Sequence, residues 1–143
     1  MGKHGADKES VRLEKKWLKE RQREIKKNIK QMLKDCKLYG FIPWAPVKIE
    51  YRDMENSNNW GWAELKLDKK GNLYFLIVLD IDFLDGSIHG EQRAYNLFAH
   101  ELAHVLTWHP NRKTDKGLTR HHGVHGPDWM YMYGTLLNLL IFA

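Results

Sequence analysis

The sequence predicts an α+β protein in which helices cover a small sheet. Residues 8–37 contain no Pro or Gly and carry apolar side chains at helical spacing, which predicts a long N-terminal helix. Residues 47–79 hold short apolar or alternating stretches that predict a mostly antiparallel, three-stranded sheet. Helical patterns return at 91–108 and 127–142. At 143 residues, we expect one domain, 1–143, with 1–40 as a basic helical segment and 41–143 as the core.

The N-terminal helix is expected to combine one apolar stripe with many basic residues. The stripe consists of Leu18, Ile25, Ile29, Met32, Leu33 and Cys36. Residues 1–40 hold 13 Lys or Arg against 6 Asp or Glu, whereas the rest of the chain holds 10 against 12, so the net charge of +5 comes from this segment. A solvated helix face with ion pairs explains the pattern, and so does a stripe that contacts nucleic-acid phosphates. The sequence leaves both interpretations open.

Turn signals bound each predicted strand. Residues 47–52 alternate apolar and charged side chains, as a half-buried strand does. Residues 60–67, which include Gly61, and residues 73–79 flank a polar turn at 68–72 and so predict a hairpin. Because 73–79 is the most apolar of these stretches, it is expected to be the central strand.

The run His100-Glu101-Leu102-Ala103-His104 predicts a metal-binding site with a carboxylate beside it. In a helix, residues four apart lie on one face, so His100 and His104 can direct two imidazoles at one metal ion. Glu101 lies beside the pair, where its carboxylate reaches a water rather than the metal. This is the HExxH pattern of zinc hydrolases, in which zinc acidifies a water, the Glu takes its proton, and the hydroxide attacks a carbonyl carbon. We therefore expect one Zn²⁺ ion, with Glu101 as the catalytic base.

A catalytic zinc ion needs a third protein ligand, which must come from elsewhere in the chain. Thr107 and Pro110 exclude a compact HExxHxxGxxH site, and a later Glu ligand is excluded because no Glu follows Glu101. The candidates that remain downstream are His109, His121, His122, His125, Asp115 and Asp128.

Among these candidates we favour His125. It lies just before the predicted start of the last helix at Pro127, and a ligand at a helix entrance is held in place. His121 and His122 lie in a polar stretch with no such constraint. His109 is followed by Pro110 and marks the end of the preceding helix.

The order of these motifs resembles a known family. An HExxH helix, a polar loop and the turn His125-Gly126-Pro127-Asp128-Trp129 are similar to the SprT-like metalloproteases, whose eukaryotic relative Spartan cleaves proteins crosslinked to DNA. In this resemblance His100, His104 and His125 match the metal ligands and Glu101 matches the catalytic base. The position of Trp108, a few residues after the second His, also resembles the family's arrangement.

The resemblance covers about residues 40–130 and implies a zincin-like fold with 41–143 as the protease core. Two features depart from it. Met130 stands where relatives often carry a basic residue, and with Cys36 as its one cysteine the sequence has no Cys-rich zinc ribbon, which many bacterial members carry.

These features predict a zinc-dependent endopeptidase, a metalloprotease that hydrolyses peptide bonds. The resemblance implies DNA-associated protein substrates and a role in DNA–protein crosslink repair. DNA is expected to contact the basic segment 1–40 and the Arg112-Arg120 loop, where Arg112, Lys113, Lys116 and Arg120 form a second basic cluster. One alternative is a metal-containing protein that binds nucleic acid or a partner without turnover. Another is a zinc peptidase with no link to nucleic acid.

The chain carries no apolar leader at 1–8 and no apolar run long enough to cross a bilayer. A single cysteine excludes an internal disulfide and fits a reducing compartment. We therefore expect a cytoplasmic protein, associated with DNA at the nucleoid if the basic segment binds it, and no membrane partner.

Overall fold

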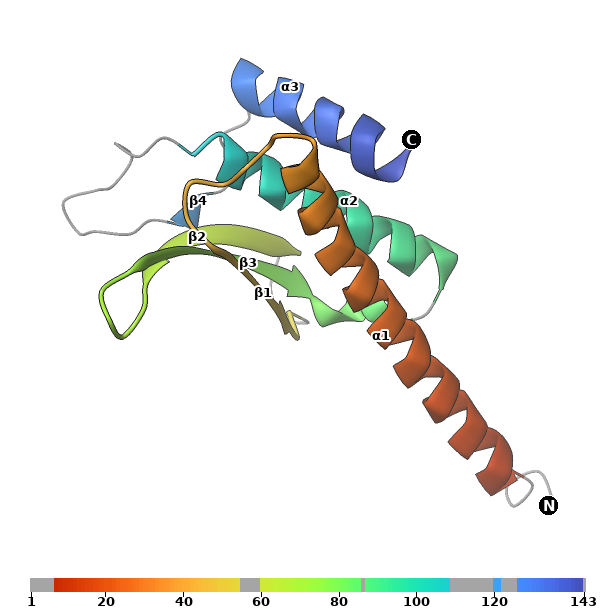
Figure 1. Ribbon diagram of the computed structural model, residues 1–143. Coiled ribbons are helices and arrows are strands. Elements are labelled where there is room, and N and C mark those ends of the chain that lie inside the picture. The colour runs from red at the N-terminus through yellow and green to blue at the C-terminus, as the bar shows by residue number, and fades with distance from the viewer. Residues whose placement is uncertain (1–6, 55–59, 86, 109–119, 122–125, 143) are drawn as a thin grey trace.

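The computed structural model describes residues 7–54, 60–85, 87–108, 120–121 and 126–142 (Figure 1). Its helices are α1 (Asp7–Leu38), α2 (Ile88–Leu106) and α3 (Pro127–Leu136), with a 3-10 turn η1 (Ile81–Leu84) before α2 and a π-helical turn η3 (Leu137–Ile141) after α3. Its strands are β1 (Val47–Arg52), β2 (Gly61–Leu67), β3 (Leu73–Asp80) and β4 (Arg120–His121). The α+β class is confirmed.

The sheet is mixed and has four strands among the described residues rather than the predicted three, although two of its three pairings are antiparallel, as predicted. The strand order is β1-β3-β2-β4, with β2 antiparallel to both β3 and β4, but β1 parallel to β3. The β2–β3 hairpin occupies one edge of β3, and β1 pairs along the other edge from Val47↔Phe75 to Arg52↔Asp80. The fourth strand is two residues long and lies within the polar loop that was expected between the HExxH helix and the turn at His125.

Asp68 closes the predicted hairpin turn. Its carboxylate accepts hydrogen bonds from the backbone N–H groups of Lys70 and Asn72, at 2.8 and 2.9 Å. Gly71 has a φ of 84°, a left-handed conformation that favours glycine. The turn at 68–72 is therefore confirmed, and its geometry follows from these residue types.

The central strand β3 is buried on both faces, as its apolar sequence predicts. Phe75, Ile77 and Leu79 belong to the main core beneath the helices, all of which lie on one side of the sheet in Figure 1. On the other side, Trp62 packs with Leu76 and Val78 in a smaller cluster. Long side chains of the sheet itself lie across this second face. Arg52 lies over the Trp62 ring and Lys48 over the Tyr74 ring, with 5.5 and 4.4 Å to the ring centroids.

The buried apolar residues that helix α1 contributes to the core lie in its second half. Ile25, Ile29, Met32 and Cys36 are buried, which confirms most of the predicted stripe. Val11, Leu13 and Trp17 in the first half are 47, 51 and 53% exposed. Figure 1 shows this half extending away from the sheet and from α2. The first half of α1 is thus a projecting arm, which the apolar pattern did not predict.

The other helix boundaries differ slightly from the prediction. Helix α2 begins at Ile88 rather than at 91 because Ser87 Oγ accepts a hydrogen bond from the Gly90 N–H, at 2.9 Å, and so caps the helix. Helix α3 begins at Pro127 as predicted, but it ends at Leu136 and continues as the π-helical turn η3. No helix within the described part of the chain combines the length and apolar character needed to cross a membrane.

Candidate metal centre

Packing of α2 fixes which side its histidines face. Phe98, Leu102 and Val105 are buried in the main core and hold the helix against the sheet and α1. His100 and His104 then face α3, where His104 is fully buried and the His100 side chain keeps 28% exposure. Glu101 is 2% exposed. The helix therefore presents the partly exposed imidazole of His100 and the fully buried imidazole of His104 beside a buried carboxylate.

The three residues converge as the HExxH pattern predicts. One ligand atom each from His100, Glu101 and His104 lies within 4.8 Å of the others. The two imidazole centroids are 5.1 Å apart, and His100 Nδ1 lies 3.0 Å from Glu101 Oε2. This arrangement can hold a metal ion.

The surroundings of the second carboxylate oxygen of Glu101 bear on whether a zinc ion fits here. Glu101 Oε1 is buried and has no hydrogen-bond partner among the described residues. Leaving a polar oxygen buried without a hydrogen-bond donor costs free energy, and a cation, or a water held by one, would satisfy it. Imidazole nitrogen with carboxylate oxygen nearby is a donor set that zinc accepts. The residues that are present fit such an ion.

The predicted third ligand lies outside the described residues. This applies to His125 and to the candidates His109, His122 and Asp115. Of His121, only the backbone is described, in β4, where it pairs with Ala63. The Arg112-Arg120 loop falls outside as well, except for the backbone of Arg120, which pairs with Glu64. The structure therefore brings together His100, Glu101 and His104 and leaves the choice of the third ligand as a prediction.

Aromatic side chains from α3 pack against the histidines. The Trp129 ring lies 4.8 Å from the His100 ring and 5.3 Å from the His104 ring, measured between centroids. Tyr133 lies 5.6 Å from His100, and burial raises the pKa of its phenol. Sequence spacing does not predict these contacts, because 25 residues separate His104 from Trp129. Trp108, which the family resemblance singled out, is a buried core residue packed edge-on to Phe75.

A polar tie joins α1 to the start of α2. Arg21 pairs with Glu91, whose other oxygen accepts from the Tyr95 hydroxyl at 2.8 Å. Asn28 Nδ2 donates to the same Tyr95 oxygen at 2.9 Å. Burial raises the pKa of Tyr95 to about 12, so its hydroxyl keeps its proton. The tie holds the helix that carries the histidines against α1.

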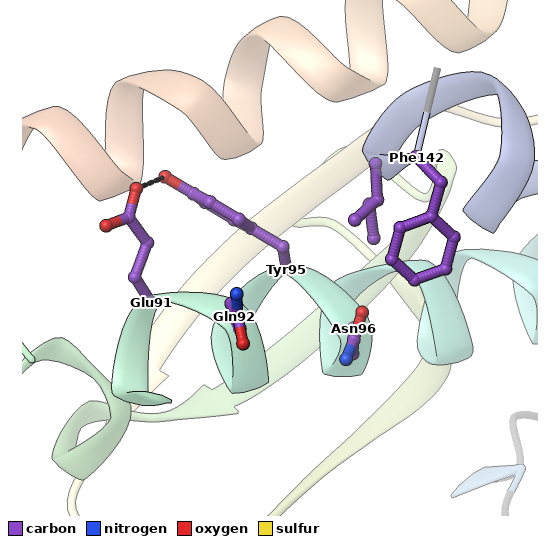
Figure 2. Close-up of a pocket in the computed structure, with 6 residues that line it drawn as sticks. Glu91, Gln92, Tyr95, Asn96 and Phe142 are labelled. Carbon is purple, nitrogen blue, oxygen red and sulfur yellow. Dashed lines mark hydrogen bonds between the residues drawn. The ribbon is translucent and has the colours of Figure 1, made fainter. Parts of the chain in front are cut away.

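Figure 2 shows a cavity beside this tie. It has a volume of about 520 Å³ and is lined by Glu91, Gln92, Tyr95, Asn96, Ile141 and Phe142. The histidines do not line it. Among the described residues that line it, Glu91 is the one with a carboxylate, and it is already paired with Arg21. The metal centre and this cavity are separate places on α2.

Comparison with protein-family models, with curated proteins and with solved structures gives no match. A functional assignment therefore depends on the residues of this chain.

Proposed function

We propose that the chain is a zinc-dependent endopeptidase with a zincin-like fold that acts on DNA-associated proteins. The convergence of His100, Glu101 and His104 within 4.8 Å on one helix, with Glu101 and His104 buried, carries the proposal. The sequence resemblance to the SprT-like metalloproteases supports it.

Each residue has a distinct role in this proposal. His100 and His104 hold the zinc ion together with His125. Zinc, when bound, supplies a Lewis acid that polarises the substrate carbonyl and lowers the pKa of water. Glu101 takes the proton from the attacking water and passes it to the leaving amine. The Glu101 side chain is buried, which limits contact between its carboxylate and bulk water. The contact between Glu101 Oε2 and His100 Nδ1 orients the carboxylate.

The first experiment substitutes Glu101→Gln, which keeps the shape of the side chain and removes its basicity. The variant should keep wild-type zinc content by atomic absorption and lose cleavage of a DNA-binding protein by at least about a hundredfold, the typical contribution of general base catalysis. Glu20→Gln, on the exposed side of α1, is the matched control and should cleave normally. Cleavage by the Glu101→Gln variant at the wild-type rate would show that Glu101 is not the base.

The proposed link to DNA is supported by the distribution of charge on α1. At 100° per residue, eleven basic side chains fall within an arc of about 120°, which extends about 45 Å along the helix. This basic face consists of Lys8, Arg12, Lys15, Lys16, Lys19, Arg23, Lys26, Lys27, Lys30, Lys34 and Lys37. Among the acidic residues of α1, Glu9 alone touches the arc, and it pairs with Arg12 at 2.8 Å.

A face of this kind suits a polyanion better than a lipid surface. A helix that lies on a membrane needs one apolar face flanked by basic residues. In the projecting half of α1, Val11 lies on the side that continues the core stripe, whereas Leu13 and Trp17 lie on another side. The phosphates of a nucleic acid would contact the basic face without burying either apolar side.

The basic face also favours a second candidate function, a metal-containing protein that binds nucleic acid without turnover. One experiment distinguishes the two functions. Purified protein is incubated with a DNA-binding protein as substrate, with and without single-stranded DNA and a chelator. Cleavage that the chelator abolishes supports the peptidase. Tight DNA binding with an intact substrate under every condition supports the alternative.

A further inference from the structure

Trp129 contacts the site more extensively than any pattern in the sequence indicates. It occupies the third position of α3, whose start is set by Pro127. Its ring stacks on His104 with an interplanar angle of 26° and meets His100 edge-on at 68°. Its Nε1–H also donates to the backbone carbonyl of His100, at 3.2 Å. One side chain from α3 thus touches both histidines of the candidate metal centre, His100 and His104, and the backbone of His100.

The indole is itself supported by its own helix. Tyr133, one turn later in α3, stacks on Trp129 with ring centroids 5.0 Å apart and an interplanar angle of 28°. The same Tyr133 ring meets His100 edge-on at 76°. The rings of His100, His104, Trp129 and Tyr133 therefore form one aromatic cluster, two rings from each helix. Edge-on and offset contacts of this kind are favourable and directional.

Such contacts matter because two imidazoles bind one ion only in matching orientations. An unrestrained histidine samples several rotamers, and fixing both rings on metal binding would cost side-chain entropy. Metal sites usually avoid this cost through neighbouring groups that orient the ligands before the metal arrives. His100 has one such neighbour in Glu101, and the indole contacts both rings.

We propose that Trp129 is a positioning residue, which holds the imidazoles of His100 and His104 in the orientation that lets them bind one zinc ion together. The inference rests on the zinc site of the proposed function. It assigns to α3 a role in building the metal centre beyond packing in the core.

The test measures zinc affinity by competition with a chromophoric chelator. Trp129→Leu should raise the zinc dissociation constant by about tenfold or more, the usual effect of losing a group that orients a ligand. Trp129→Phe keeps an aromatic ring but loses the N–H donor, so its loss should be about fivefold, that of one neutral hydrogen bond. Tyr131→Leu is the matched control, because Tyr131 is in the same helix but 75% exposed, and it should bind zinc as the wild type does.

Two further measurements separate positioning from simple stability. The absorption spectrum of the Co²⁺-loaded protein reports ligand geometry, and it should change in Trp129→Leu but not in Tyr131→Leu. In the metal-free wild type, the imidazole NMR signals of His100 and His104 should show one restrained conformation each. This last measurement needs no variant, so freely rotating imidazoles would overturn the inference even if Trp129→Leu fails to fold.

The outcomes distinguish this inference from the proposed function. A wild-type protein that binds zinc, with a folded Trp129→Leu variant of equal affinity and identical cobalt spectrum, overturns the inference alone. Freely rotating imidazoles in the metal-free wild type overturn it as well. A wild-type protein that binds no zinc overturns both the inference and the proposed peptidase.

Discussion

At the scale of single residues, the missing side chain of Gly61 allows the sheet to lie close to α2. A Cβ atom at this position would lie 2.6 Å from the Val78 carbonyl oxygen and 3.1 Å from Leu97 Cδ2. The first neighbour is backbone, which cannot move without disturbing the β2–β3 pairing. Leu97 is one helical turn before Glu101, so a shift of α2 here would reach the metal centre.

Gly61→Ala should therefore destabilise the protein. Overpacking of this kind costs about 1–3 kcal/mol, which urea unfolding followed by circular dichroism would detect. Gly134→Ala is the matched control and should not destabilise the protein. A Cβ at Gly134 meets nothing within 4 Å, and alanine is more favourable than glycine within a helix. Equal unfolding free energies for Gly61→Ala and the wild type would show that the sheet and α2 adjust easily.

The sequence reveals some of these residues and hides others for a physical reason. His100, Glu101 and His104 lie within five residues on one helix, so helical periodicity alone brings them together. The contacts of Trp129 and the crowding at Gly61 depend on how distant segments pack. Spacing along the chain carries no information about either.

At the scale of elements, the basic face of α1 gives a prediction about nucleic acid. Lys30→Gln with Lys34→Gln removes two charges from this face, at exposed positions. Lys69→Gln with Lys70→Gln removes the same charge from the exposed β2–β3 turn. If phosphates contact α1, only the first pair should weaken DNA binding and flatten its salt dependence, by about 0.9 in log–log slope for each lost contact.

Fluorescence anisotropy with a labelled duplex would measure this over a range of salt concentrations. A duplex of about 13 base pairs spans the basic face at 3.4 Å per step. Equal losses for the two double variants would mean that net charge governs binding, rather than the face on α1. No binding by the wild type at low salt would remove the nucleic-acid link altogether.

Element boundaries followed local signals more closely than element pairing did. The turn at Asp68, the start of α3 at Pro127 and the apolar centre of β3 were all predicted from nearby residues. The parallel direction of β1 was not predicted, because a central position for β3 does not set the direction of the strand on its free edge. The contact of Lys26 in α1 with the Tyr51 ring of β1 was not predicted either, since it joins segments far apart in the sequence.

At the scale of the whole molecule, buried phenols tie stability to pH. Burial, with a smaller effect from Tyr95, raises the pKa of Tyr51 well above its ordinary value of 10.0. The folded protein therefore keeps a proton that the unfolded chain releases above pH 10. The stabilisation is complete below that pH and is lost as the pH rises through the folded-state pKa. Tyr95 acts in the same direction.

Tyr51→Phe isolates this effect, because it removes the ionisable group and keeps the ring beneath Lys26. Between pH 8 and pH 11, the wild type should lose about 1.4 kcal/mol more unfolding free energy than the variant, the value for one pH unit above the unfolded pKa. Urea unfolding at the two pH values measures it, with Tyr131→Phe as the exposed control that should follow the wild type. If Tyr51→Phe declines as steeply as the wild type, the Tyr51 phenol does not couple folding to pH, and the alkaline loss must come from other groups.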